Sequence, residues 1–175
     1  LAFQQFEQSQ NMTEAVGALN VLTHRSGPLR SQALGSFYQR WQEDALVLDK
    51  WFRIQAASRR ENVLDDVENL MKHEKFSFHT PNRVRALVGG FSQGNFLRFH
   101  HENGKGYQWL AFQIQALDNT NPQVAARLLT PLVRWQQFAE PYQSKMYQAL
   151  KQIFNTPELS KDVFEIVCKS LGESL

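Results

Sequence analysis

Apolar residues recur along this chain at intervals of three and four positions, which is the spacing of one face of an α-helix. In the segment that begins at Pro28, for example, Leu34, Phe37 and Trp41 occupy such positions. No window of five or more residues shows the strict alternation of a half-buried strand flanked by turn residues. The pattern therefore predicts an all-α protein.

Clusters of Gly, Pro, Asn and Ser separate the periodic runs and predict where each helix begins or ends. Asn11 followed three residues later by Glu14 predicts a capping box. Asn121 with Pro122 predicts another helix start, because Asn binds free amide groups of the first turn and Pro fits the next position. The predicted helices cover residues 13–23, 28–41, 44–58, 62–72, 83–88, 107–117, 124–135, 139–154 and 160–171.

Three local features qualify this set of helices. Gly89-Gly90 predicts the end of the helix over 83–88, because glycine readily adopts the left-handed conformation that is common after a helix. Segment 91–105 contains several Gly and Asn residues, and we interpret it as a structured loop with a single helical turn at 96–99. Pro131 predicts a kink within 124–135.

The order of the helices predicts their arrangement. Helices that alternate with short loops favour antiparallel pairs, and an armadillo- or HEAT-like α-α superhelix is built by stacking such pairs. No internal repeat at a fixed period is visible in the sequence. The superhelix prediction therefore rests on the helices and their connections.

Composition narrows the class of protein. The chain has 175 residues, of which 42% are hydrophobic and 21% charged, as in an ordinary globular protein with a substantial core. A net charge of +2, with basic residues dispersed along the chain, argues against nucleic-acid binding. No stretch approaches the roughly 18 apolar residues of a membrane span. The only cysteine, Cys168, has no disulfide partner in the chain, which predicts a reducing, cytoplasmic compartment.

The chain carries no recognisable catalytic or metal motif. A helical zinc peptidase needs His-Glu-x-x-His, and the His-Glu pairs at His73 and His101 each lack the second histidine. There is no Gly-x-Ser-x-Gly nucleophile turn and no glycine-rich phosphate loop. Cys168 falls on an apolar helical face and is interpreted as a packing residue. We therefore assign no catalytic, metal or cofactor residue to this chain.

Arginines near predicted helix starts are the remaining candidates. Arg83 and Arg85 follow Pro81-Asn82, and Arg127 lies in the first turns after Asn121-Pro122. The planar guanidinium group suits carboxylates and backbone carbonyls. From the residues alone, substrate binding and ordinary salt bridges both remain open.

Several phrases carry a resemblance to a known family. Residues 46–52 (LVLDKWF), 82–91 (NRVRALVGGF) and 121–129 (NPQVAARLL) resemble the C-terminal helical domain of the bacterial aminopeptidase N family, zinc enzymes of the gluzincin group. Residues 11–13 (NMT) and 104–107 (GKGY) continue the resemblance in the same order. The family's Gly-x-Met-Glu-Asn and His-Glu-x-x-His motifs belong to its catalytic domain, and neither occurs here.

The resemblance implies that residues 1–175 form the C-terminal domain of a larger aminopeptidase, an expectation in line with the absence of an initiator methionine at Leu1. The zinc would then lie in the catalytic domain of the same polypeptide, which is the implied partner together with a peptide substrate. In this family the helical domain closes the active-site chamber and limits access. Carried over by motif, Arg85 and Arg127 would contact the peptide backbone or its C-terminal carboxylate. Arg83 would point outward or form a structural ion pair.

Two other functions stay open on the sequence. A free-standing helical-repeat scaffold could bind a partner protein in its groove. An independent hydrolase with an unfamiliar site is the third alternative, and it would require zinc and peptidase activity in this chain alone.

Overall fold

The computed structural model describes residues 1–173, and all regular secondary structure in that part of the chain is helical. The elements are α1 (Ala2–Glu7), α2 (Met12–Thr23), α3 (Pro28–Trp41), α4 (Ala45–Ala56), α5 (Val63–Met71), α6 (Pro81–Val84), the π-helix η1 (Arg85–Gly89), α7 (Gly90–Ser92), α8 (Phe96–Phe99), α9 (Lys105–Asp118), α10 (Pro122–Leu128), the 3-10 helix η2 (Trp135–Gln137), α11 (Tyr142–Phe154) and α12 (Lys161–Leu171). The predicted all-α class is therefore confirmed.

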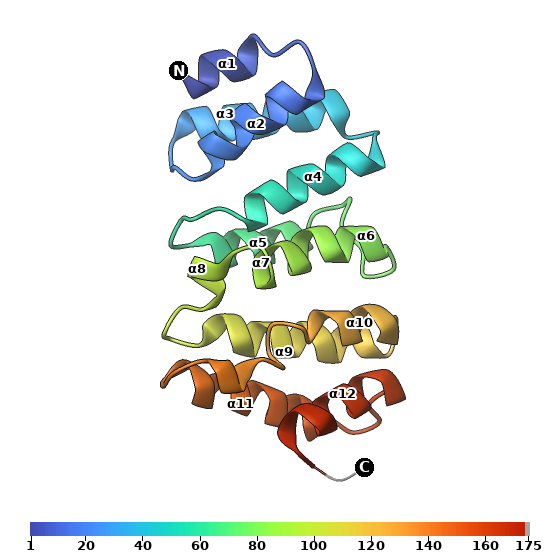
Figure 1. The fold of residues 1–175 in the computed structure, drawn as a ribbon. Coiled ribbons are helices and arrows are strands. Elements are labelled where there is room, and N and C mark those ends of the chain that lie inside the picture. Colours follow the sequence, from blue (N-terminus) through green and yellow to red (C-terminus); the bar gives the residue numbers. More distant parts are fainter. Residues whose placement is uncertain (174–175) are drawn as a thin grey trace.

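The helices are stacked in layers from α1 at one end to α12 at the other (Figure 1). Consecutive helices pack as pairs, namely α2 with α3, α4 with α5, α9 with α10, and α11 with α12. The pairs are joined through a continuous row, in which α2 contacts α4, α4 contacts η1 and α7, η1 contacts α10, and α10 contacts α12. We call this series the first row.

Predicted capping residues start several of these helices. The Asn11 side chain accepts a hydrogen bond from the Glu14 amide at 3.0 Å, and the Glu14 carboxylate accepts one from the Gln10 amide at 3.0 Å. This confirms the capping box, with the amide of Gln10 in place of that of Asn11. The Asn121 side chain caps α10 by accepting a hydrogen bond from the Val124 amide. The Ser160 side chain caps α12 in the same way, with the Val163 amide as the donor.

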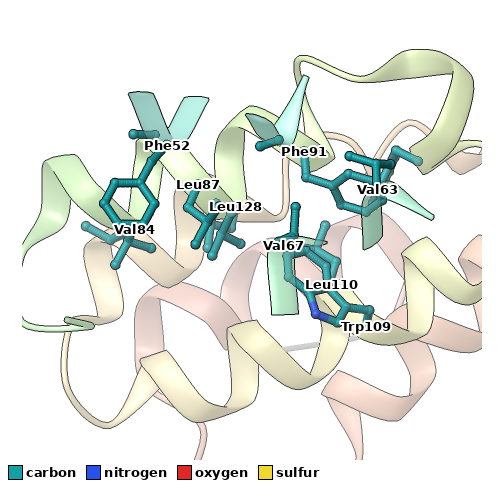
Figure 2. Close-up of a cluster of buried hydrophobic side chains, with 14 of the residues drawn as sticks. Phe52, Val63, Val67, Val84, Leu87, Phe91, Trp109, Leu110 and Leu128 are labelled. Carbon is teal, nitrogen blue, oxygen red and sulfur yellow. The ribbon is translucent and has the colours of Figure 1, made fainter. Parts of the chain in front are cut away.

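The layers share one hydrophobic core that runs between the helices. In its central part, side chains from α4, α5, η1, α9 and α10 meet, including Phe52, Leu87, Leu110 and Leu128 (Figure 2). These four side chains are at most 1% exposed. Such close packing fixes the first-row helices relative to one another, and therefore fixes the backbone positions from which their outer side chains extend.

The predicted helix end at Gly89-Gly90 is wrong. Both glycines have right-handed helical φ angles, −66° and −59°, and the helix continues through η1 into α7. A Cβ atom added to Gly90 would lie 3.3 Å from the Ala56 Cβ atom and 3.5 Å from the Arg53 Cα atom. Glycine at this position therefore allows α7 to approach α4 closely.

The predicted helix over 124–135 is also too long, because α10 ends at Leu128. A proline ring clashes with the carbonyl group four residues earlier and provides no N–H for it. Pro131 thus excludes a helical hydrogen bond to the Arg127 carbonyl, and the helix ends instead of bending. The helical turn at 96–99 is confirmed as α8, whereas the short helix α1 was not predicted.

Candidate functional site

A hollow of about 670 Å³ lies where α4, η1, α7 and α10 of the first row come together. Its lining consists of Arg53, Ala57, Arg85, Gly89, Gly90, Gln93, Gly94, Arg127, Leu128 and Thr130. Arg85 and Arg127, the two arginines for which the family resemblance implies a substrate contact, are among these residues. The fold therefore brings together two side chains that lie in separate sequence phrases.

Each arginine of the hollow comes from a different member of the first row. Arg53 lies in the last turn of α4, Arg85 begins η1, and Arg127 lies in the last turn of α10. All three are exposed. The Arg85 Nε atom donates a hydrogen bond at 3.2 Å to the carbonyl of Pro81, four residues earlier. This bond orients the Arg85 guanidinium group toward the preceding helical turn.

Among residues 1–173, the lining of the hollow includes three arginines and no Asp or Glu. Within residues 1–173, none of these three arginines forms an ion pair. Basic residues that are dispersed in the sequence are thus concentrated here by the fold. An anion entering the hollow would meet positive charge on several sides, with no carboxylate in the lining to compete with it.

A second hollow of about 420 Å³ adjoins the first and shares Arg53 and Arg85 with it. Lys50 adds another cation to its lining, and Asp49 is the one carboxylate there. The Asp49 Oδ1 atom is 2.5 Å from the Arg83 Nε atom, so its charge is already compensated. We call the two hollows together the arginine groove.

Arg83 has a structural role: of the two arrangements expected for it, outward orientation or an ion pair, the structure shows the ion pair. Arg83 is only 6% exposed. Its guanidinium group pairs with Asp49, donates a hydrogen bond to the Lys75 carbonyl, and lies 4.9 Å from the centre of the Phe52 ring. Arg83 and Arg85 are two positions apart on one helical segment, so they point to different sides. One is held inside the protein, whereas the other is available at the surface.

The edge of the groove between α7 and α10 is held by the Arg127 carbonyl. This oxygen accepts hydrogen bonds from the Gln93 Nε2 atom at 3.3 Å and from the Thr130 hydroxyl at 2.8 Å. It also accepts a hydrogen bond from the Thr130 amide at 3.4 Å, a bond that spans only three residues, because Pro131 has no N–H for the α-helical bond. The same proline that ends α10 therefore allows α7 to be joined to it beside the Arg127 side chain.

Arg53 is the arginine of the groove that is not among the candidates predicted from the sequence. Its position on the non-core side of α4, with Leu46 and Lys50 at helical spacing, could have shown that it is exposed. No sequence signal links it to Arg85 or Arg127, because that neighbourhood depends on how the helices are stacked.

The described residues do not fit a zinc site. In residues 1–173 no group of three or more His, Cys, Asp or Glu side chains is placed to hold a metal ion. His73 packs against the rings of Tyr38, Trp51 and Phe52, and burial lowers its pKa. Cys168 is fully buried. These side chains serve packing, and we derive no chemical step through a metal from this chain.

His101, the other histidine of a His-Glu pair, lines a different hollow in which acidic and basic side chains are mixed. The helices of residues 1–173 include none with the length and apolar character required to cross a bilayer.

Comparison with known sequences identifies the fold family. Residues 1–172 match a family described as a domain of unknown function (DUF3458_C) with ARM repeats. The chain belongs to this ARM-repeat family. The predicted armadillo-like arrangement of stacked helices is thereby confirmed.

This ARM-repeat chain is similar to part of bacterial aminopeptidase N. It is 42% identical to the Haemophilus influenzae protein over 166 residues, and 39% identical to the Escherichia coli K12 protein over 172 residues. These alignments cover 95% and 98% of the chain but only 19% and 20% of the relatives. The chain therefore spans about one-fifth of their length, and the segment matched is C-terminal.

A solved structure shares the fold. The crystal structure of Legionella pneumophila aminopeptidase A in complex with aspartic acid superimposes on the ARM-repeat chain with a TM-score of 0.92 and 35% sequence identity. The match covers 98% of this chain and 20% of that one.

Proposed function

We propose that residues 1–175 are the C-terminal domain of a zinc-dependent aminopeptidase, which removes N-terminal amino acids from peptides. The zinc and the catalytic groups would belong to the catalytic domain of the same polypeptide. The extended similarity to aminopeptidase N, with relatives about five times as long, supports this proposal. The lone, buried Cys168 is in line with a reducing, cytoplasmic compartment.

The proposed role of the ARM-repeat domain is to close the active-site chamber and to control which substrates enter it. The arginine groove is the part of the wall that contacts the bound peptide. The observation that carries this assignment is that Arg85 and Arg127, from separate phrases of the sequence, line one hollow without a carboxylate. Their guanidinium groups can each donate two parallel hydrogen bonds to a carboxylate or to backbone carbonyls.

The effect on catalysis is positional. A peptide has one free carboxylate at its C-terminus, and a groove that binds this group holds that end away from the zinc. The amino end is then the end presented to the catalytic domain. Packing of η1 and α10 fixes the backbone positions from which the two side chains extend, and the hydrogen bond to the Pro81 carbonyl orients the Arg85 side chain before the peptide arrives, which lowers the entropic cost of binding.

The test uses Arg85→Ala and Arg127→Ala in the complete enzyme. We expect kcat/KM for short peptides with a free carboxylate to fall roughly ten- to a hundredfold, because a hydrogen bond to a charged group contributes about 1.5–3 kcal/mol. Hydrolysis of an alanyl arylamide, which has no carboxylate, should be unchanged. Arg25→Ala removes an exposed arginine outside the groove and is the matched control. Unchanged kinetics on peptides of several lengths would remove the substrate role.

The domain assignment has its own test. The truncated enzyme without residues 1–175 is assayed on the arylamide with and without this chain added in trans. Restored or altered turnover supports an accessory domain that completes the chamber. An inert mixture, in which the two parts also fail to bind, would favour the free-standing scaffold.

A further inference from the structure

The arginine groove contains more positive charge than the carboxylate of a peptide terminus can balance. Arg53, Arg85 and Arg127 line the first hollow, and Lys50 joins Arg53 and Arg85 in the second. One carboxylate would leave at least two of the three guanidinium groups of the first hollow uncompensated. Arg53 is the arginine of the groove that has no role in the proposed function.

We propose that Arg53 is a specificity residue that binds an acidic side chain at the C-terminal end of the peptide. The enzyme would therefore favour peptides that end in Asp or Glu over peptides that end in Asn or Gln. This inference rests on the proposed function, because it assumes that the peptide's C-terminus lies in the arginine groove.

The location of Arg53 supports a second binding position beside the first. Arg53 and Arg85 line both hollows, so the two side chains lie along their shared border. A Cβ atom on Gly90 would be only 3.5 Å from the Arg53 Cα atom, which shows how closely α7 packs on α4 at this point. An acidic side chain next to a terminal carboxylate on the same residue matches two neighbouring guanidinium groups.

The donors of Arg53 are available to a ligand. Within residues 1–173, hydrogen bonds from arginine side chains are made by Arg30, Arg60, Arg83, Arg85 and Arg98. Arg53 is not among them, and it forms no ion pair in that part of the chain. Asp49, four residues earlier on α4, is paired with Arg83. A carboxylate ligand therefore does not have to displace an internal partner of Arg53.

Charge balance gives the direction of the preference. Three like charges around one hollow repel one another, and a ligand with two negative charges relieves more of this repulsion than a ligand with one. A C-terminal Asp or Glu provides the second negative charge without a change in backbone position. A C-terminal Lys adds a fourth positive charge and is expected to bind worst.

The experiment compares peptides that differ only in their last residue. The complete enzyme is assayed with pentapeptides that share an N-terminal alanine and end in Asp, Asn or Lys. For the unmodified enzyme we expect kcat/KM to be roughly three- to tenfold higher for Asp than for Asn, as for a partly solvated charge pair. The ratio should fall as ionic strength rises, because salt screens exposed charges.

Substitutions at position 53 separate charge from shape. Arg53→Ala should bring the Asp to Asn ratio to about one, Arg53→Lys should retain part of it, and Arg53→Glu should reverse the order so that the Lys peptide is preferred to the Asp peptide. Arg25→Ala is the control and should leave the ratio unchanged. Thermal unfolding of each variant verifies that the fold is intact, which is expected because Arg53 is exposed.

The outcomes distinguish this inference from the proposed function. If the ratio is the same in all position-53 variants while Arg127→Ala still lowers kcat/KM for free-acid peptides, the role of Arg53 is wrong and the carboxylate site stands. If neither the Arg53 variants nor Arg127→Ala change kcat/KM for any of the peptides, both proposals are wrong. A reversed preference in Arg53→Glu would establish direct contact with the last residue.

Discussion

Replacing Arg83 by alanine should destabilise the protein strongly, whereas the same change at Arg85 should leave its stability unchanged. The Arg83 side chain is 7% exposed and is paired with Asp49, whose side chain is 17% exposed. Arg83 also donates to the Lys75 carbonyl and covers the Phe52 ring. Its removal would leave a largely buried carboxylate and a carbonyl group without partners.

The size of the effect follows from the cost of an unpaired buried charge. Breaking a buried ion pair from one side costs about 3–5 kcal/mol, and the partial exposure of Asp49 places this case at about 2–3 kcal/mol. A loss of 1 kcal/mol lowers Tm by about 2–4 °C in a chain of this size, so the expected decrease is roughly 5–10 °C. For the exposed Arg85 the change should stay within about 0.5 kcal/mol.

Thermal and urea unfolding of the chain, followed by circular dichroism, measure both variants. A double variant, Arg83→Met with Asp49→Leu, provides the decisive comparison. If the cost of Arg83→Ala comes from the abandoned charge, removing both charges together should recover most of the lost stability. Equal Tm values for Arg83→Ala and Arg85→Ala would refute the structural role of this ion pair.

Three further predictions concern packing and pH. In Gly106→Ala the new Cβ atom would lie 2.5 Å from the Phe99 carbonyl oxygen, so urea unfolding should show a loss of about 1–3 kcal/mol. In Gly17→Ala, where nothing lies within 4 Å, the same assay should show a gain of up to about 1 kcal/mol. If Gly106→Ala proved as stable to urea as Gly17→Ala, this packing around Gly106 would be contradicted. Leu110→Ala empties a fully buried position and should cost about 2–5 kcal/mol, measured in the same way. Burial lowers the pKa of His100 below its usual 6.5, so the unfolded chain takes up a proton that the folded chain resists. Stability should therefore fall as the pH drops below about 6.5, and a smaller fall in His100→Gln is the expected result of pH-dependent Tm measurements.

The sequence predicted those elements of the fold that depend on near neighbours in the chain. Helical periodicity located most helices, and the capping groups Asn11, Asn121 and Ser160 act as their residue types suggest. The helix end predicted at Gly89-Gly90 was wrong because contacts with a segment distant in the sequence determine the backbone there. Gly90 resembles a helix terminator, yet it lies inside a continuous helical segment because α4 packs against it. Glycine can end a helix, or it can allow two helices to approach closely. The sequence near Gly90 does not show that Ala56 lies against it, and so it predicts the first of these two roles in place of the second.

The candidate site shows the same division more sharply. The phrases around Arg85 and Arg127 carry a family resemblance, and so the amino-acid sequence alone names these two residues as candidates. Arg53 directly follows the phrase at 46–52, but the resemblance assigns it no substrate contact, and its candidacy rests on the residues that line the hollow with it. That environment is produced by stacking, because α4, η1 and α10 each contribute one arginine and the nearby Asp49 is taken by Arg83. A repeat fold can therefore concentrate charge on one face while the chain as a whole stays close to neutral, at +2. In such a protein, the net charge of the whole chain does not predict which ligands a surface binds. That depends on which carboxylates are paired with cations and which cations are left without a partner.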